Sequence, residues 1–221
     1  MQRIIFLHGF GEDKTIFEKI APQLEGEHLF PDLWALLGDV PRPELNVLFF
    51  AQQLVNEYLI TKNDVIIGHS MGGWIAYHIK HLVGCRIVQI ASWIHFDRVI
   101  QAIKNESLRT WLVKNHLFFT NIARYYIVRK FYKDKPSKEV FVYAFNRLKK
   151  GNPENVLNQL RVILNPVNET ITVLPDLRIH SKSDSIIRAP REPYTEVKGD
   201  HFNLWAYPEE VYPLIVKLLN S

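Results

Sequence analysis

Apolar residues form short runs that alternate along the chain with longer stretches of helical spacing. The short runs cover residues 3–7, 27–31, 64–68, 86–91, 177–180 and 194–197. They are too short for helices and are bounded by Gly, Pro and charged residues, so each is predicted to form a strand. The runs 64–68 and 86–91 are apolar on both faces, which is typical of parallel strands with helices on either side.

Apolar residues recur every three or four positions in most of the intervening segments. This spacing predicts helices over residues 15–24, 44–59, 72–82 and 208–219. Strands that alternate with helices favour an α/β fold, with a doubly wound, mainly parallel sheet flanked by helices. The six predicted strands would give a sheet of about six strands.

The alternation stops after Ile94. About 75 residues follow with helical periodicity, many aromatic and basic side chains and no convincing strand. We expect a helical insertion over about residues 95–170, which leaves residues 1–94 and 171–221 for the core. No repeat, low-complexity run or flexible linker separates the two parts, so the chain is predicted to be a single domain.

The large apolar residues of the insertion allow two interpretations. Such residues most often pack inserted helices against one another, but a few of them would line an apolar ligand pocket if the insertion covers one. The residues concerned are Trp111, Leu112, Leu117, Phe118, Tyr125, Tyr126, Phe131, Tyr132, Phe141 and Phe145.

Length and composition allow one sizeable core, because the chain has 221 residues of which 47% are hydrophobic. No stretch approaches the roughly 18 to 20 apolar residues that a membrane-spanning helix needs, and the N-terminus lacks the pattern of a signal peptide. Cys85 is the only cysteine, so no internal disulfide can form. A cytoplasmic protein without integral membrane association is therefore expected.

The net charge of +4 is unevenly distributed. Residues 95–170 contain 14 Lys or Arg against 6 Asp or Glu, whereas the rest of the chain contains 13 against 17. The sequence has no zinc-ligand spacing, RNA-binding aromatic signature or clear helix-turn-helix, so we do not expect nucleic-acid binding. No His and carboxylate cluster has the spacing of a metal site, and neither a metal nor a cofactor is expected.

The segment Gly68-His69-Ser70-Met71-Gly72 fits the pattern G-x-S-x-G and lies between a predicted strand and a predicted helix. That context is the one in which a nucleophilic serine occupies a tight, strained turn, with small residues on either side for close packing. A helix N-terminus also favours developing negative charge. Ser70 is therefore predicted to be a nucleophile, and the alternative is a serine that only caps a helix.

A second motif, His8-Gly9-Phe10-Gly11, follows the first predicted strand. Acyl transfer needs two N–H donors aimed at the oxyanion, one from the residue after the nucleophile and one from this earlier loop. Met71 and Phe10 are predicted to supply them through their backbones. His8 at a strand end beside glycines is more often structural than catalytic.

A serine hydroxyl needs a base near neutral pH, and the base needs an acceptor that orients it. His201 follows the last predicted strand and precedes the C-terminal helix, which places it at the same sheet edge as Ser70. Asp184 follows the preceding strand and is the leading candidate for the acid. Asp97 and Asp176 remain alternatives, and Asp200 is expected in an exposed turn.

These motifs resemble those of the α/β-hydrolase superfamily, and the resemblance covers essentially the whole chain. It rests on residues 8–11, on Gly68 to Gly73, on Asp184 and on residues 199–202. The chain is most similar to small carboxylesterases, including those acting on acyl groups attached to a carrier protein, and to related lyases and carbon–carbon hydrolases. The resemblance implies that the insertion after residue 94 is a lid that covers the active site.

The chain departs from the family pattern in two ways. It begins at the strand before the oxyanion loop, so the first two strands of the family are expected to be missing. Asp184 and His201 are only 17 positions apart, so a short turn is expected where the family usually has a helix.

We expect hydrolysis of a carboxylic ester or thioester through an acyl-enzyme, with a small-molecule ester or acyl compound as substrate. The basic, aromatic insertion favours a narrower hypothesis, in which an apolar tunnel takes the acyl chain and Lys and Arg bind an anionic carrier such as acyl carrier protein or coenzyme A. A carbon–carbon hydrolase or lyase with the same residues is one alternative. A non-catalytic ligand-binding protein is another, since fold alone does not establish activity.

Overall fold

A computed structural model of the chain describes residues 1–220. Its centre is a six-stranded sheet in the order β2-β1-β3-β4-β5-β6, in which every neighbouring pair is parallel. The strands are β1 (Arg3–Leu7), β2 (Glu27–Leu29), β3 (Val65–His69), β4 (Arg86–Ile90), β5 (Leu177–His180) and β6 (Thr195–Glu196). The prediction of about six parallel strands is confirmed, and each strand lies within two residues of its predicted bounds.

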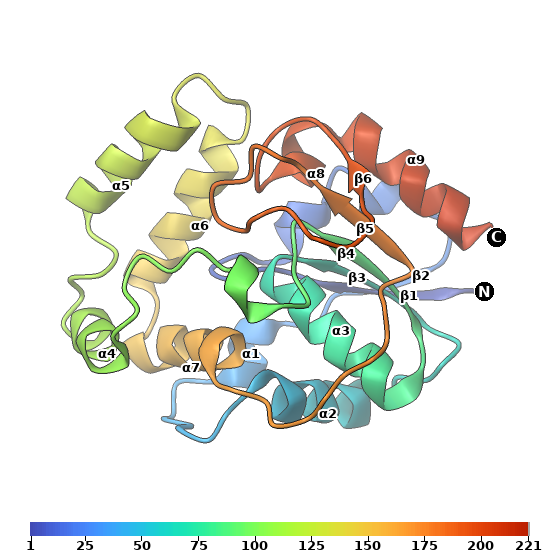
Figure 1. Ribbon diagram of the computed structural model, residues 1–221, viewed down its shortest axis with the longest axis horizontal. Coiled ribbons are helices and arrows are strands. Elements are labelled where there is room, and N and C mark those ends of the chain that lie inside the picture. The colour runs from blue at the N-terminus through green and yellow to red at the C-terminus, as the bar shows by residue number, and fades with distance from the viewer. Residues whose placement is uncertain (221) are drawn as a thin grey trace.

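Helices cover both faces of the sheet (Figure 1). One face packs against α1 (Leu33–Leu37), α2 (Val47–Tyr58), α3 (Met71–Val83) and α7 (Pro153–Leu164). The other face packs against η1 (Lys14–Phe17), α6 (Lys138–Lys150), α8 (Asn203–Ala206) and α9 (Pro208–Leu219). Ile5 and Leu7 of β1 enter the first core, while Ile4 and Phe6 enter the second. This alternation explains why the central strands are apolar on both faces.

Residues 15–24 do not form the single helix that their spacing predicts. They form two short 3-10 helices, η1 and η2 (Ala21–Gln23). Pro22 explains the break, because its ring nitrogen has no N–H to donate and its ring would clash with the carbonyl of residue 18 in a continuous helix. The prediction is therefore wrong at this point.

Helix α1 was not predicted, although its boundary residues are visible in the sequence. The side chain of Asp32 accepts hydrogen bonds from the N–H groups of Trp34 and Ala35 and caps the start of the helix. Gly38 ends it with a φ of 65°, a conformation that glycine adopts without strain. Five residues are too few to show a helical period.

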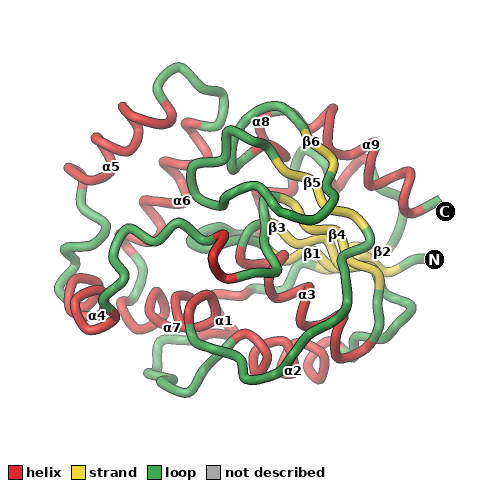
Figure 2. Tube along the Cα trace, viewed as in Figure 1, coloured by secondary structure: helices red, strands yellow, loops and turns green. Residues whose placement is uncertain are grey.

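The segment between β4 and β5 is helical (Figure 2). It contains η3 (Phe96–Arg98), α4 (Glu106–Lys114), α5 (Asn121–Ile127), the π-helical segment η4 (Val128–Tyr132), α6 and α7. In Figure 1, α4, α5 and α6 lie at the end of the molecule opposite the two chain termini. Between β5 and β6 the chain makes turns and no helix, as the short spacing predicts.

No helix within residues 1–220 is long and apolar enough to cross a membrane.

Candidate active site

Ser70 occupies a strained turn between β3 and α3. Its φ is 51° and its ψ is −118°, a conformation that L-residues rarely adopt. Two hydrogen bonds hold the turn: the Ser70 N–H donates to the Ile90 carbonyl at 2.9 Å, and the Ser92 hydroxyl donates to the Ser70 carbonyl at 2.7 Å. The serine is therefore fixed by its neighbour β4 as well as by its own strand.

Three glycines leave the space that this turn needs. A Cβ on Gly72 would overlap the Leu7 carbonyl of β1, and a Cβ on Gly68 would overlap the backbone at Gly72. A Cβ on Gly73 would lie 2.6 Å from the Ser92 hydroxyl. Helix α3 thus approaches β1 and the loop after β4 more closely than any side chain at these positions allows.

His201 bridges Ser70 and Asp184. Its Nε2 lies 2.9 Å from the Ser70 hydroxyl, and its Nδ1 lies 2.8 Å from Asp184 Oδ2. The other carboxylate oxygen of Asp184 accepts from the N–H groups of Ile186 and Ile187, at 2.8 and 2.9 Å. The structure therefore brings together the three side chains that the sequence singled out, and it orients the carboxylate from both sides.

Burial and neighbouring negative charge act in opposite directions on the pKa of His201. Burial lowers the pKa of a histidine, but the negative charge of Asp184 and its hydrogen bond raise it, and the pKa of His201 ends above its usual value. Asp184 is almost fully buried. Its burial would raise its pKa, but His201, His180 and the Ile187 N–H together outweigh burial and the pKa ends below its usual value, so the carboxyl is ionised at neutral pH.

The two alternative candidates for the acid, Asp97 and Asp176, lie away from His201. Asp97 is exposed and pairs with Arg191 at 2.6 Å and with Arg98 at 3.2 Å. Asp176 accepts from the Ile87 N–H at 2.7 Å and also pairs with Lys80. Neither carboxylate contacts His201.

Asp200 is not in an exposed turn, so that prediction is wrong. Only 1% of its surface is exposed, and its carboxylate accepts from the Ser137 hydroxyl at 2.6 Å and from the Phe202 N–H at 3.1 Å. Ser137 directly precedes α6. Asp200 therefore connects the insertion to the loop that carries His201, a contact that no local pattern indicates.

The loop after β1 positions the Phe10 N–H. Within residues 1–220, neither this N–H nor that of Met71 donates to a protein acceptor. The neighbouring N–H groups are occupied: Gly9 donates to Glu12 at 2.7 Å and Gly11 to Gln159 at 3.0 Å. His8 is buried and its Nδ1 contacts the Gly9 carbonyl at 2.9 Å, which is a structural contact.

Glu12 and His69 form a buried pair next to His201 that no sequence motif indicates. His69 Nδ1 lies 2.8 Å from Glu12 Oε2, and His69 Nε2 lies 2.8 Å from the His201 carbonyl oxygen. Burial would raise the pKa of Glu12, but His69 offsets it and the pKa ends below its usual value. The two nitrogens of His69 thus face a carboxylate and a carbonyl, both of which accept hydrogen bonds. The pair therefore holds the main chain of His201 in place through its carbonyl oxygen.

Glu12, His69 and His201 also bring potential metal-ligand atoms within 4.8 Å of one another. The hydrogen bonds just described account for this grouping without an ion.

Glu12→Gln is expected to lower kcat/KM about 10- to 100-fold, because a loosened His201 no longer aligns with Ser70. The charge of Glu12 also raises the pKa of His201. Since the base must be neutral, the acidic limb of the pH profile should move to lower pH. Glu18→Gln, on the exposed surface of the same segment, is the matched control. A wild-type rate and pH profile in Glu12→Gln would contradict a positioning role.

An apolar cavity of about 360 Å³ opens at Ser70 and His201. Its walls come largely from the insertion, and its aromatic lining consists of Phe10, Phe119, Phe131, Tyr132, Phe141, Phe145 and Phe202. Of the ten large apolar residues for which the sequence allows two interpretations, Phe131, Tyr132, Phe141 and Phe145 thus line a pocket. Trp111, Leu117, Tyr125 and Tyr126 are instead exposed.

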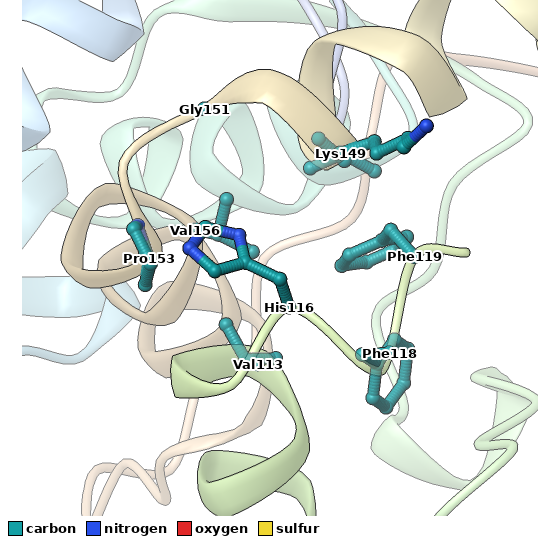
Figure 3. A pocket seen from close by; sticks show the side chains of 9 residues that line it. Val113, His116, Phe118, Phe119, Lys149, Gly151, Pro153 and Val156 are labelled. Carbon is teal, nitrogen blue, oxygen red and sulfur yellow. The ribbon is translucent and has the colours of Figure 1, made fainter. Parts of the chain in front are cut away.

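A second, much smaller cavity lies between α4 and the start of α7 (Figure 3). His116, Phe118 and Phe119 approach it from one side and Pro153 and Val156 from the other. Its volume of about 10 Å³ is room for about one water molecule. It is a packing gap within the insertion rather than a ligand site.

A doubly wound parallel sheet with a serine on a strand-to-helix turn, and a histidine and an aspartate on later loops, defines an α/β hydrolase. The sequence matches the model of the alpha/beta hydrolase family over residues 4–214. The chain therefore belongs to this family.

Known relatives agree with this assignment. A Mycoplasma pneumoniae protein that carries the provisional name esterase/lipase 3 is 26% identical over 141 residues, which are 62% of this chain. The aligned region spans 44% of that protein, less than half its length.

Solved structures share the fold. A hydrolase from Oleispira antarctica has a TM-score of 0.75 at 16% identity, over 100% of this chain and 92% of its own. A thermophilic esterase from Thermogutta terrifontis, solved with malate bound, has a TM-score of 0.73 at 16% identity, over 100% and 90% of the two chains.

Proposed function

We propose that this chain is a serine hydrolase that cleaves a carboxylic ester or thioester through an acyl-enzyme. The observation that carries the proposal is the hydrogen-bonded series from Ser70 through His201 to Asp184, with distances of 2.9 and 2.8 Å. Both distances lie within the range that proton transfer and orientation require. The names of the relatives also support ester hydrolysis.

The reaction follows from the roles of these groups. The Ser70 hydroxyl attacks the substrate carbonyl carbon while His201 Nε2 takes its proton, and the N–H groups of Phe10 and Met71 stabilise the oxyanion. His201 then gives the proton to the departing alcohol or thiol, which leaves an acyl group on Ser70. Water, deprotonated by His201, attacks this acyl group, and His201 returns the proton to the departing Ser70 oxygen, which releases the acid and free Ser70.

The acyl group is expected to be apolar, because aromatic and aliphatic side chains dominate the cavity wall next to Ser70. The narrower hypothesis of an acyl group on acyl carrier protein or coenzyme A rests on the basic charge of the insertion. The exposed aromatic residues among those cations favour a different partner, which is argued below.

Labelling with a fluorophosphonate tests the proposal directly. Intact-protein mass spectrometry should show one adduct on the wild type and none on Ser70→Ala, and the variant should lose at least about 10⁴-fold in kcat/KM on p-nitrophenyl esters. Ser183→Ala, an exposed serine on the Asp184 loop, should keep both labelling and activity. A folded wild type that is neither labelled nor active would favour a ligand-binding protein. Labelling without ester hydrolysis would favour carbon–carbon cleavage.

Ala144→Phe tests the cavity as the acyl site. Ala144 lies on α6 and lines the cavity, so a phenyl ring there would occupy space that a long acyl chain needs. The ratio of kcat/KM for decanoyl over acetyl esters should fall about 10-fold or more, since each apolar group in a pocket is worth roughly that factor. Ala35→Phe, on the exposed surface of α1, should leave the ratio unchanged. An unchanged ratio in Ala144→Phe would place the acyl chain elsewhere.

A further inference from the structure

Helix α5 and the π-helical segment η4 are apolar on two opposite sides. The inner stripe, defined as Ala123, Ile127, Val128 and Phe131, packs against the core cluster that also contains Tyr132 and Phe141. Ile127 and Phe131 line the cavity beside Ser70. Partial burial of this inner stripe against the core accounts for which side of the segment faces inward.

The opposite side of the same segment exposes large apolar residues. Ile122 is 71% exposed, Tyr126 is 65% exposed and Tyr125 is 58% exposed. Their positions differ by three and four, so they lie on one side of the helix. The two tyrosine rings contact each other, with centroids 5.6 Å apart. The inner stripe already packs against the core, so these exposed apolar residues add no stability to the helix in water. The exposed face therefore needs a separate explanation.

Cations continue this face toward its C-terminal end. Arg129, Lys130 and Lys133 are exposed, and within residues 1–220 none of them forms an ion pair with a carboxylate. Arg129 donates to the Tyr125 hydroxyl at 3.2 Å, which joins the apolar part to the basic part. Asp134 is the one acidic residue among positions 121–134. We call Ile122, Tyr125, Tyr126, Arg129, Lys130 and Lys133 the outer stripe.

Helix α4 adds further apolar surface at the same end of the molecule. Trp111 is 54% exposed and Leu108 is 48% exposed, and they lie three positions apart on α4. Figure 1 places α4 and α5 at the end that is farthest from the chain termini. The apolar and basic surface is therefore concentrated on the insertion.

We propose that the outer stripe docks the protein on an anionic lipid surface. Amphipathic aromatic residues favour the membrane interface, and lysine and arginine beside them are attracted to anionic headgroups. An acidic carrier protein would satisfy the cations but would leave the exposed Ile122 and the two tyrosines without an apolar partner. Ile127 and Phe131 of the inner stripe line the cavity, so docking places the proposed acyl site close to the membrane. This last consequence rests on the proposed function, whereas docking itself does not.

Sedimentation with lipid vesicles tests the inference. The wild type should bind vesicles of phosphatidylglycerol mixed with phosphatidylcholine, and should bind phosphatidylcholine alone much more weakly. Lys130→Gln/Lys133→Gln should weaken binding to the anionic vesicles about 30-fold, since each lysine at such a surface is worth roughly a factor of five. Ile122→Ser/Tyr126→Ser should weaken it about 10-fold or more through lost apolar burial.

Two control variants make the same kinds of substitution at exposed positions outside the outer stripe. Lys62→Gln/Lys217→Gln removes two exposed lysines, and Val40→Ser/Phe49→Ser removes two apolar side chains that are 71% and 58% exposed. Both should bind vesicles as the wild type does. No outer-stripe residue lines the cavity, so hydrolysis of a water-soluble acetyl ester should be the same in every variant.

Three results would overturn the inference: a wild type that does not bind anionic vesicles, stripe variants that bind no worse than their controls, or stripe variants that lose binding only to purified acyl carrier protein. Vesicle binding by a wild type that hydrolyses no ester would support the inference and contradict the proposed function.

Discussion

Asp184→Asn is expected to lower kcat/KM about 10⁴-fold on p-nitrophenyl esters. Its fold and its free energy of unfolding should change little. The amide presents no charge to stabilise protonated His201, and it permits the wrong tautomer at Nδ1. Asp184 raises the pKa of His201. Because the base acts when neutral, the residual activity of the variant should have its acidic limb at lower pH than the wild type.

Asp97→Asn is the control for this prediction. Asp97 also follows a strand end, but its carboxylate pairs with Arg191 on the surface. Its kcat/KM and pH profile should equal those of the wild type, as measured by steady-state kinetics across the pH range. A large loss in Asp97→Asn together with an active Asp184→Asn would reverse the assignment of the acid.

Gly72→Ala is expected to unfold the protein or to lower its free energy of unfolding by about 4 kcal/mol or more, at the upper end of single-substitution effects. The new methyl group would overlap the Leu7 carbonyl, which is main chain in a central strand and cannot move aside. Either β1 or the start of α3 must shift, and both carry the site. Urea denaturation followed by circular dichroism measures the change.

Gly84→Ala gives the comparison for Gly72→Ala. Gly84 ends α3 with a φ of 73°, and a Cβ there would have no atom within 4 Å. Only the left-handed conformation is then penalised, at about 1 kcal/mol. Equal losses in the two variants would contradict the close approach of α3 to β1 as the reason for glycine at position 72.

Helix α5 also shows why apolar residues in the insertion could not be sorted in advance. Tyr125 and Tyr126 are exposed, whereas Phe131 and Tyr132, a few positions later, line the cavity. The spacing of three and four identifies a helix, but both sides of this helix are apolar. Which side faces the core is decided by α6 and by the loop that carries His201.

The parallel sheet, and the proximity of the candidate residues that follow strand ends, can be predicted from sequence alone. Strands β1 and β5 and helix α9 have the predicted bounds because their patterns are local: an apolar run, or a period of three and four, between clear breaks. Ser70, His201 and Asp184 are predicted to lie close together for a related reason. In a parallel sheet the carboxyl ends of all strands meet at one edge, so residues after those ends come together.

The contacts of Glu12, His69 and Asp200 depend on segments that are distant in the sequence. Glu12 meets His69 across 57 positions of sequence, and Asp200 meets Ser137 across 63. Each is a polar residue in a loop or at a strand end, and side chains of this kind at such positions are usually exposed to solvent. Their burial depends on partners supplied by distant segments, because a buried charge is stable only where another group hydrogen-bonds to it.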